Sequence, residues 1–476
     1  MIDSESLLQQ LWSVSHANVL LLGGVFFIAV GLMRAVSSLR SERLLCGAGC
    51  LVVLGIAAVA MLMTEPTEAS AGALFVSDAV TLSGAKLAIF GGVLLVLLGW
   101  DQIKPGHAAD HYGCLLMMLS GLIYASSAND LVSLFLGLEL VSIPTTVLLS
   151  INRSDDLGRE ATLKYFTLAS FTSAIFLLGA SYLYGLAGST SLPAIYESLA
   201  GNTSVFARVA LGLSLCGLCF RVTAVPFHFY APDVFAGSAP HMAASMSLVP
   251  KVAGFVAIIR LLGGANLNPA MVDLAIPLLL VIAVTTMTLG NCAALIQTRL
   301  RRTLAYSSVA HSGYLLLAIA AILSTGGAST IVFDYLIIYA AMTLGMFAVV
   351  LTVENASDGS DELTHLNGLY FRNPWIAISG TVCLLSLTGL PLTAGFWAKL
   401  QIFLTSLAAD RLDIRIATIA MAINATIAAV YYLSLVYRLY QPSTASPSLS
   451  LSRVPFSVSV VCGLSSILTV IWFFVP

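Results

Sequence analysis

The stretch RVTAVPFHFYAPDVFAGSAPHMAASMSLVPKVAGFVAIIR, residues 221–260, decides the fold. It lies deep in an apolar chain, yet it contains Arg221, Lys251 and four prolines, at positions 226, 232, 240 and 250. Proline lacks an N–H and clashes with the carbonyl four residues earlier, so a helix that carries one is kinked or broken there. Buried charge next to a broken helix is typical of ion, proton or substrate paths in membranes. The stretch therefore predicts a transport segment.

The composition around this stretch is that of a membrane protein. Of the 476 residues, 58% are hydrophobic and 9% are charged, and the mean hydropathy is +0.95. Soluble domains carry about 25% charged residues. We expect an all-α polytopic protein in the lipid bilayer. The net charge of −2 indicates no nucleic-acid partner. The first residues, MIDSESLLQQLWSVSHA, lack Lys and Arg, so we expect no cleaved signal peptide.

Fourteen apolar runs are long enough to cross a bilayer, which takes about 20 residues of helix. They span residues 17–36, 43–63, 79–100, 113–128, 130–151, 162–187, 205–230, 240–262, 271–295, 303–323, 328–353, 374–407, 412–438 and 454–475. Alternating the loops between two sides places 13 Lys and Arg residues on one side and 4 on the other. Because basic loops favour the cytoplasmic side, we expect both termini on the outer face.

The seventh and twelfth runs share an interruption. The seventh carries VPFH at 225–228, and the twelfth carries GLPLTAGF at 389–396. They are five helices apart, and an odd spacing makes equivalent helices run in opposite directions. This pattern is typical of an inverted repeat with broken helices.

Four ionisable residues fall inside the predicted spans: Glu139, Arg221, Lys251 and Lys399. Each charge at mid-membrane costs at least about 2.5–3.5 kcal/mol on insertion scales. The signs predict a pair between Glu139 and a cation, followed by a line of cations. A lysine on which burial and a nearby carboxylate act in opposite directions can load and release a proton. The alternative is that these residues are structural ion pairs that tie helices together.

Prolines 144, 226 and 250 remove helix hydrogen bonds close to Glu139, Arg221 and Lys251. The freed carbonyls can bind water along a hydrophilic path. The pattern is partial, because Pro391 frees the carbonyl of Leu387, which we expect to be remote from Lys399.

Several other polar residues lie in or beside the spans. His311 and His228 are each interpreted either as proton relays or as hydrogen-bonding residues between helices. His107 and His111, in GHAADHY, are expected in a solvated loop. Lys86 is expected to extend its ammonium along the helix towards the membrane surface. The sequence contains no nucleotide-binding loop, haem motif or zinc spacing, so we expect no metal or cofactor bound by this chain.

At these residues the chain resembles the antiporter-like membrane subunits of respiratory complex I, and among them the N-type subunit of bacterial NADH–quinone oxidoreductase. The resemblance reaches from the fifth run to the twelfth. It rests on LFLGLELVSIPTTVL (134–148), EATLKYFTLASFTSAIFLLG (160–179), VPFHFYAPDVFAG (225–237), PKVAGF (250–255), RRTLAYSSVAHSGY (301–314) and SLTGLPLTAGFWAKLQIF (386–403).

The resemblance implies two inverted five-helix repeats with helices 7 and 12 broken. The chain then divides into residues 1–112, 113–264, 265–440 and 441–476. It also implies proton transfer along a buried charge axis, with Glu139 as the modulating partner, Lys251 as the central relay and Lys399 as the terminal donor. NADH, FMN, iron–sulfur clusters and quinone would be bound by partner subunits. M-, K- and J-type membrane subunits would be neighbours in a bacterial inner membrane.

The chain departs from the family pattern at Arg221, where the family usually has lysine. Arginine stays protonated, so it can hold Glu139 but is a poor proton carrier. His241, just before the eighth run, is a candidate for the missing titratable group. Three alternatives stay open: a multisubunit sodium/proton antiporter, a membrane hydrogenase-type complex, and a structural subunit that does not pump.

Overall fold

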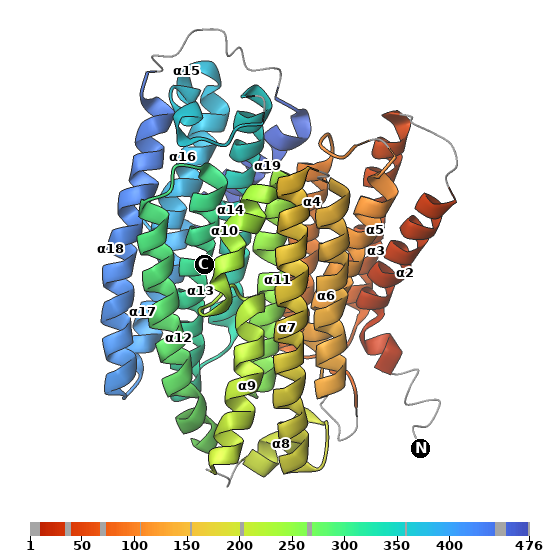
Figure 1. Ribbon diagram of the computed structural model, residues 1–476, viewed down its shortest axis with the longest axis vertical. Helices are drawn as coiled ribbons and strands as arrows, with labels where there is room; N and C mark the ends of the chain where they lie inside the picture. The colour runs from red at the N-terminus through yellow and green to blue at the C-terminus, as the bar shows by residue number, and fades with distance from the viewer. Residues whose placement is uncertain are drawn as a thin grey trace.

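The computed structural model describes residues 10–33, 40–66, 73–104, 106–152, 155–199, 204–263, 269–357, 359–442 and 454–474. Within these ranges the chain is helical, and its helices stand side by side in one bundle (Figure 1). The helices before the first break are α2 (Ser15–Leu32), α3 (Arg40–Met63), α4 (Ala79–Gly99), α5 (Ala108–Ser127), α6 (Leu131–Asn152), α7 (Asp156–Ala187) and the short α8 (Leu192–Leu199).

The rest of the chain contains both breaks. In order, its helices are α9 (Val205–Arg221), η1 (Phe227–Phe229), α10 (Tyr230–Gly237), α11 (Pro240–Leu261), α12 (Pro269–Leu295), α13 (Leu300–Thr325), α14 (Thr330–Ala356), η2 (Leu363–Leu366), α15 (Leu369–Arg372), α16 (Pro374–Thr388), α17 (Ala394–Ala408), α18 (Leu412–Tyr440) and α19 (Phe456–Phe474).

The predicted all-α membrane fold with broken helices 7 and 12 is confirmed. In the described part of the chain, eleven helices are long and apolar enough to cross a membrane. The 20-residue α5 and the two broken pairs, α9 with α10 and α16 with α17, correspond to the remaining predicted runs. The structure corrects two boundaries. The seventh run continues to Gly237, and α5 begins at Ala108, so the expected division at 112/113 falls inside a helix.

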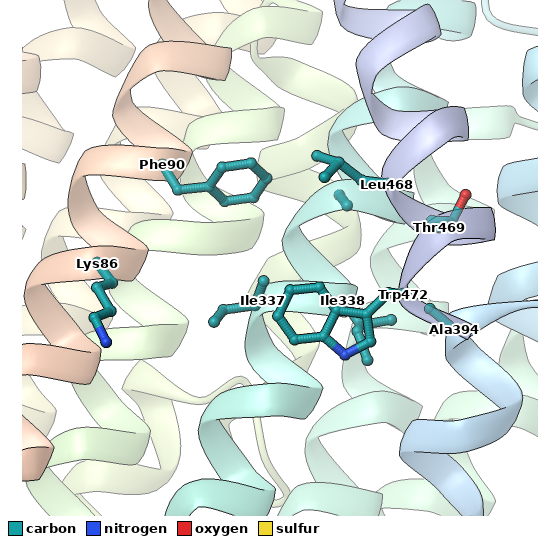
Figure 2. Close-up of a pocket in the computed structure, with 9 residues that line it drawn as sticks. Lys86, Phe90, Ile337, Ile338, Ala394, Leu468, Thr469 and Trp472 are labelled. Carbon is teal, nitrogen blue, oxygen red and sulfur yellow. The ribbon is translucent and has the colours of Figure 1, made fainter. Parts of the chain in front are cut away.

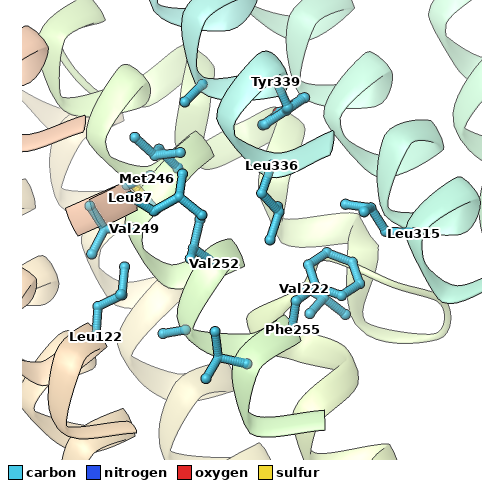
Figure 3. Close-up of a cluster of buried hydrophobic side chains, with 14 of the residues drawn as sticks. Leu87, Leu122, Val222, Met246, Val249, Val252, Phe255, Leu315, Leu336 and Tyr339 are labelled. Atoms are coloured by element: carbon cyan, nitrogen blue, oxygen red, sulfur yellow. The ribbon is translucent and has the colours of Figure 1, made fainter. Parts of the chain in front are cut away.

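The centre of the bundle is α11. All residues of its apolar membrane-spanning stretch are buried inside the bundle. The corresponding stretches of α13 and α14 are almost entirely buried as well. A helix that is apolar all round is typical of such a position. Val249, Val252 and Phe255 of α11 pack against Leu122 of α5 and Leu336 of α14 (Figure 3). In contrast, α3 and α18 expose rows of large apolar side chains that suit a lipid environment.

Two ion-pair networks hold α10, the short second half of helix 7. Asp233 of α10 contacts Lys164 of α7 at 2.7 Å and Arg302 of α13 at 3.0 Å. Arg301, which is buried, pairs with Glu354 at 2.9 Å and donates to the carbonyl of Ser238 just after α10. Since α10 is only eight residues long, these contacts from two neighbouring helices fix its position.

Candidate functional site

The first part of the site is an ion pair between α6 and α9. The Nη2 atom of Arg221 lies 2.7 Å from Oε1 of Glu139 and 3.2 Å from the Ser173 hydroxyl, while Nη1 donates to the Leu138 carbonyl at 3.1 Å. Ser173 in turn donates to Glu139 at 2.6 Å. The predicted pair between Glu139 and a cation is therefore present, and its cation is Arg221. The Arg221 side chain is 4% exposed and that of Glu139 is 23% exposed.

The break in helix 7 places hydroxyl groups beside this pair. After Arg221 the chain leaves the helix, and the Thr223 hydroxyl donates to the Val222 carbonyl at 2.6 Å. The amide of Val225 donates to Thr286 of α12 at 3.0 Å, and the Thr223 hydroxyl lies 3.4 Å from that of Ser312 in α13. The break thus contacts hydroxyls from two helices, α12 and α13.

Lys251 occupies the centre of α11 and is 1% exposed. Its Nζ donates to the carbonyl and the hydroxyl of Ser308, at 2.6 and 2.5 Å, and lies 3.4 Å from the hydroxyl of Tyr339. The same ammonium lies 4.6 Å from the centre of the Tyr339 ring, within range of a cation–π contact. The Ser312 hydroxyl donates to the Ser308 carbonyl at 3.2 Å, so hydroxyls connect the break in helix 7 to Lys251.

These contacts solvate Lys251 with neutral groups. In the described part of the chain no carboxylate pairs with its ammonium. We expected a nearby carboxylate to favour the charged form of this lysine and burial to favour the neutral form. No carboxylate among the described residues contacts Lys251, so the first of these effects does not act by direct contact. Burial favours the neutral amine, and the three oxygens and the ring favour the ammonium.

His311 bridges two tyrosines in the middle of α13. Its Nδ1 lies 2.7 Å from the hydroxyl of Tyr335 on α14, and its Nε2 lies 3.2 Å from the hydroxyl of Tyr432 on α18. Tyr432 also hydrogen-bonds to Ser307. Because imidazole can accept a proton at one nitrogen and donate from the other, this geometry suits a relay. It equally supplies the inter-helix hydrogen bonds of the alternative interpretation.

Lys399 of α17 closes the other end of the site. Its Nζ donates to the carbonyls of Leu387 and Thr388, both at 2.8 Å, and lies 5.5 Å from the centre of the Tyr314 ring. The expectation that the Leu387 carbonyl is remote from Lys399 is wrong. The chain turns back after α16, where Gly389 has a φ of +85°, and this turn returns Lys399 to the end of the helix it follows.

The structure also places the four other histidines named in the sequence analysis. His241 lies at the start of α11, where its ring packs 5.3 Å from that of His111. The solvated-loop expectation for His111 is therefore wrong, since this residue lies inside α5 and is buried, whereas His107 is exposed. His228 lies half-buried in η1, at the break of helix 7. Its Nδ1 has no hydrogen-bond partner among the described residues.

A strip of residues on α13 lies between the two lysines. Ser308 contacts Lys251, His311 follows three residues later, and Tyr314 underlies Lys399 three residues after that. Residues three apart on a helix lie on one side, about 4.5 Å apart along the axis. Lys251, His311 and Lys399 are predictable from the sequence as buried ionisable residues, but their Ser and Tyr partners are not. Four of the Ser and Tyr residues that contact the site, Ser307, Ser308, Ser312 and Tyr314, lie in the motif AYSSVAHSGY.

The described residues contain no cluster of three or more His, Cys, Asp and Glu side chains that could hold a metal ion. The polar groups of the site instead form separate hydrogen-bonded groups around Glu139, Lys251, His311 and Lys399. This arrangement can hold and pass protons between hydroxyl, imidazole and amine groups.

Fold and site together define an antiporter-like membrane protein with a buried axis of ionisable side chains. Residues 128–424 match the family described as NADH:quinone oxidoreductase/Mrp antiporter, transmembrane. The chain belongs to this family, and the expected resemblance is confirmed. It is 33% identical to the NADH-quinone oxidoreductase subunit N of Anoxybacillus flavithermus, over 98% of this chain and 95% of that protein. It is 36% identical to the subunit N of Desulfovibrio desulfuricans, over 87% and 85%.

Solved structures agree in fold. A chain of respiratory complex I from Thermus thermophilus superposes with a TM-score of 0.81 at 28% identity, and the match covers 97% of both chains. A chain of the Mrp complex from Dietzia superposes equally well, with a TM-score of 0.82 over 98% of this chain and 94% of that one. Its 19% identity makes it evidence of fold alone.

Proposed function

We propose that this chain is subunit N of a bacterial NADH–quinone oxidoreductase and that it moves protons along the series Glu139–Arg221, Lys251, His311 and Lys399. The observation that supports the proposal most strongly is the strip of residues on α13 formed by Ser308, His311 and Tyr314, whose ends contact the two buried lysines. A purely structural role would not need titratable and hydrogen-bonding groups at successive turns between them.

In this proposal each ionisable residue has its own task. Glu139 is the acid whose pairing changes during the cycle, and Arg221 is its fixed counter-charge. Lys251 and Lys399 exchange protons through His311 and the hydroxyls around it. We also propose that His228 and His241 carry protons to the series. Their positions, at the break of helix 7 and at the start of α11, support this role.

The complex would supply what this chain lacks. NADH, FMN, iron–sulfur clusters and quinone are assigned to partner subunits, and M-, K- and J-type subunits are the proposed membrane neighbours. The chain would lie in the bacterial inner membrane with both termini outside. The proposed repeats are α5 to α11 and α12 to α18, flanked by residues before α5 and after 440.

The test measures protons moved per electron. Lys251→Met and Lys399→Met should each lower proton pumping by membrane vesicles while NADH is oxidised. The matched control is Lys104→Met, because Lys104 is an exposed lysine outside the series. Normal proton-to-electron stoichiometry in both Lys251→Met and Lys399→Met would contradict the proposed path. The same measurement in sodium-free and sodium-containing buffer separates proton pumping from the sodium/proton antiporter alternative.

A further inference from the structure

Away from the buried series, four helices enclose an apolar pocket of about 220 Å³. Its walls come from α4, α14, α17 and α19 and include Phe90, Ile338, Leu468 and Trp472. Figure 2 shows Lys86 and Phe90 on one helix, facing Leu468 and Trp472 across the pocket. These walls present almost no polar surface, so whatever fills the pocket must itself be apolar.

Lys86 is the only charged residue that lines this pocket. It is exposed, and within the described part of the chain its ammonium forms no hydrogen bond or ion pair. It lies seven residues after the start of α4, which is about 10 Å along the helix axis. A lysine stem can carry its ammonium back towards the helix end, so the charge lies closer to the membrane surface than its Cα does.

The pocket runs from this surface to the break in helix 12. The first residues of α4 and Ser329, just before α14, line a common cavity with Arg260, so α4 and α14 begin at the same end of the bundle. Trp472 lies near the end of α19, and an indole ring with one polar edge suits the membrane–water interface. At the deeper end the wall includes Ala394, the first residue of α17.

We propose that the pocket binds one phospholipid, with its phosphate on Lys86 and part of one acyl chain between α4, α14 and α19. A cation at the mouth of an apolar pocket matches an amphiphile that has an anionic head and a hydrocarbon tail. A soluble anion would leave the apolar walls uncovered. A helix of a partner subunit is about 10–12 Å wide, too wide for a pocket of this volume. The tail would pack against the start of α17, five residues before Lys399.

The test counts phospholipids that stay bound to the purified, intact complex. The complex is reconstituted in nanodiscs of dioleoylphosphatidylglycerol and dioleoylphosphatidylethanolamine and then analysed by native mass spectrometry. Lys86→Ala removes the phosphate contact, and Ile337→Trp fills the pocket while leaving the charge. We expect each variant to retain one phospholipid fewer than the wild type. Lys104→Ala and Leu464→Trp, which are exposed positions outside the pocket, should retain the wild-type number.

An unchanged phospholipid count in both pocket variants would overturn the proposal. A second measurement stays informative if a variant fails to assemble. A photo-activated benzoylphenylalanine in place of Phe90 should add the mass of a phospholipid to this chain. A cross-link to another protein subunit would instead show that a protein side chain occupies the pocket, and would refute the lipid.

Discussion

Removing Arg221 should destabilise the subunit strongly, and removing Glu139 as well should restore much of the loss. The two side chains are joined at 2.7 Å, and Arg221 is 4% exposed. Breaking a buried pair by deleting one partner costs about 3–5 kcal/mol, because a charge is left without its counter-charge. The Glu139 side chain is 23% exposed, so the pair is only partly buried and we expect Arg221→Met to fall at the lower end. About 3 kcal/mol corresponds to roughly a 100-fold change in the folding equilibrium.

The assay is a double-mutant cycle on the purified complex. Arg221→Met, Glu139→Gln and the double variant are compared with the wild type by thermal denaturation and by the amount of assembled complex. The double variant should be markedly more stable than Arg221→Met, because neither charge is then left alone in the membrane. If Arg221→Met and the double variant are equally unstable, Arg221 acts through its packing and its bond to Leu138, and the ion-pair reasoning is refuted.

Three further predictions follow from other parts of the site. Gly389→Ala should impair pumping with little effect on assembly of the complex, because the added Cβ would lie 2.8 Å from Cδ of Lys399 and φ is +85° there; Gly326→Ala, also at positive φ but in open space, is the control. His311→Gln should lower the pumping rate by about 10²-fold if the imidazole relays protons, whereas it should change stability alone if the residue only ties helices together. Asp78→Asn should lower thermal stability at neutral pH, since Asp78 contacts Arg260 at 2.7 Å. Burial tends to raise the Asp78 pKa, but its bonds to Arg260 and Thr81 outweigh this and hold the pKa below 3.8. The stabilisation is therefore present above about pH 4 and lost as the pH falls through the folded pKa, so melting curves of wild type and Asp78→Asn should converge in acid. A constant difference across that range would contradict this explanation.

The helices could be predicted because each depends on local properties of the chain. Each continuous apolar run corresponds to a membrane-spanning helix or a broken pair of helices. Prolines 226 and 391 mark the two breaks. The breaks also explain where the boundaries failed. Hydropathy falls in the stretch APDVFAGSAP, so the second half of helix 7 was cut short, although Asp233 is neutralised there by Lys164 and Arg302. Ion pairs between residues that are far apart in the sequence cannot be predicted from the hydropathy of a short stretch.

The buried charges could be predicted because they stand out in an apolar sequence, but their partners could not. Tyr339 and Tyr432 occur in apolar runs where a tyrosine is unremarkable, and only the packing of α14 and α18 against α13 brings their hydroxyls to Lys251 and His311. The contact of Lys399 with the Leu387 carbonyl also depends on tertiary structure and cannot be predicted from spacing along the sequence. Along a continuous helix these residues would be about 18 Å apart, and the turn between them removes that separation.

The carbonyls at the end of α16 give Lys399 a second role. The amides of Gly389 and Leu390 satisfy the carbonyls of Leu385 and Ser386, and the ammonium takes those of the last two residues. Lys399 is thus the cap of a helix whose negative end favours a positive charge, by about 0.3–1 kcal/mol and up to about 2 kcal/mol in buried sites. In the proposed proton path, release of a proton from Lys399 would remove that stabilisation from the end of α16. The proposed proton path would therefore couple the protonation of Lys399 to the stability of the break in helix 12.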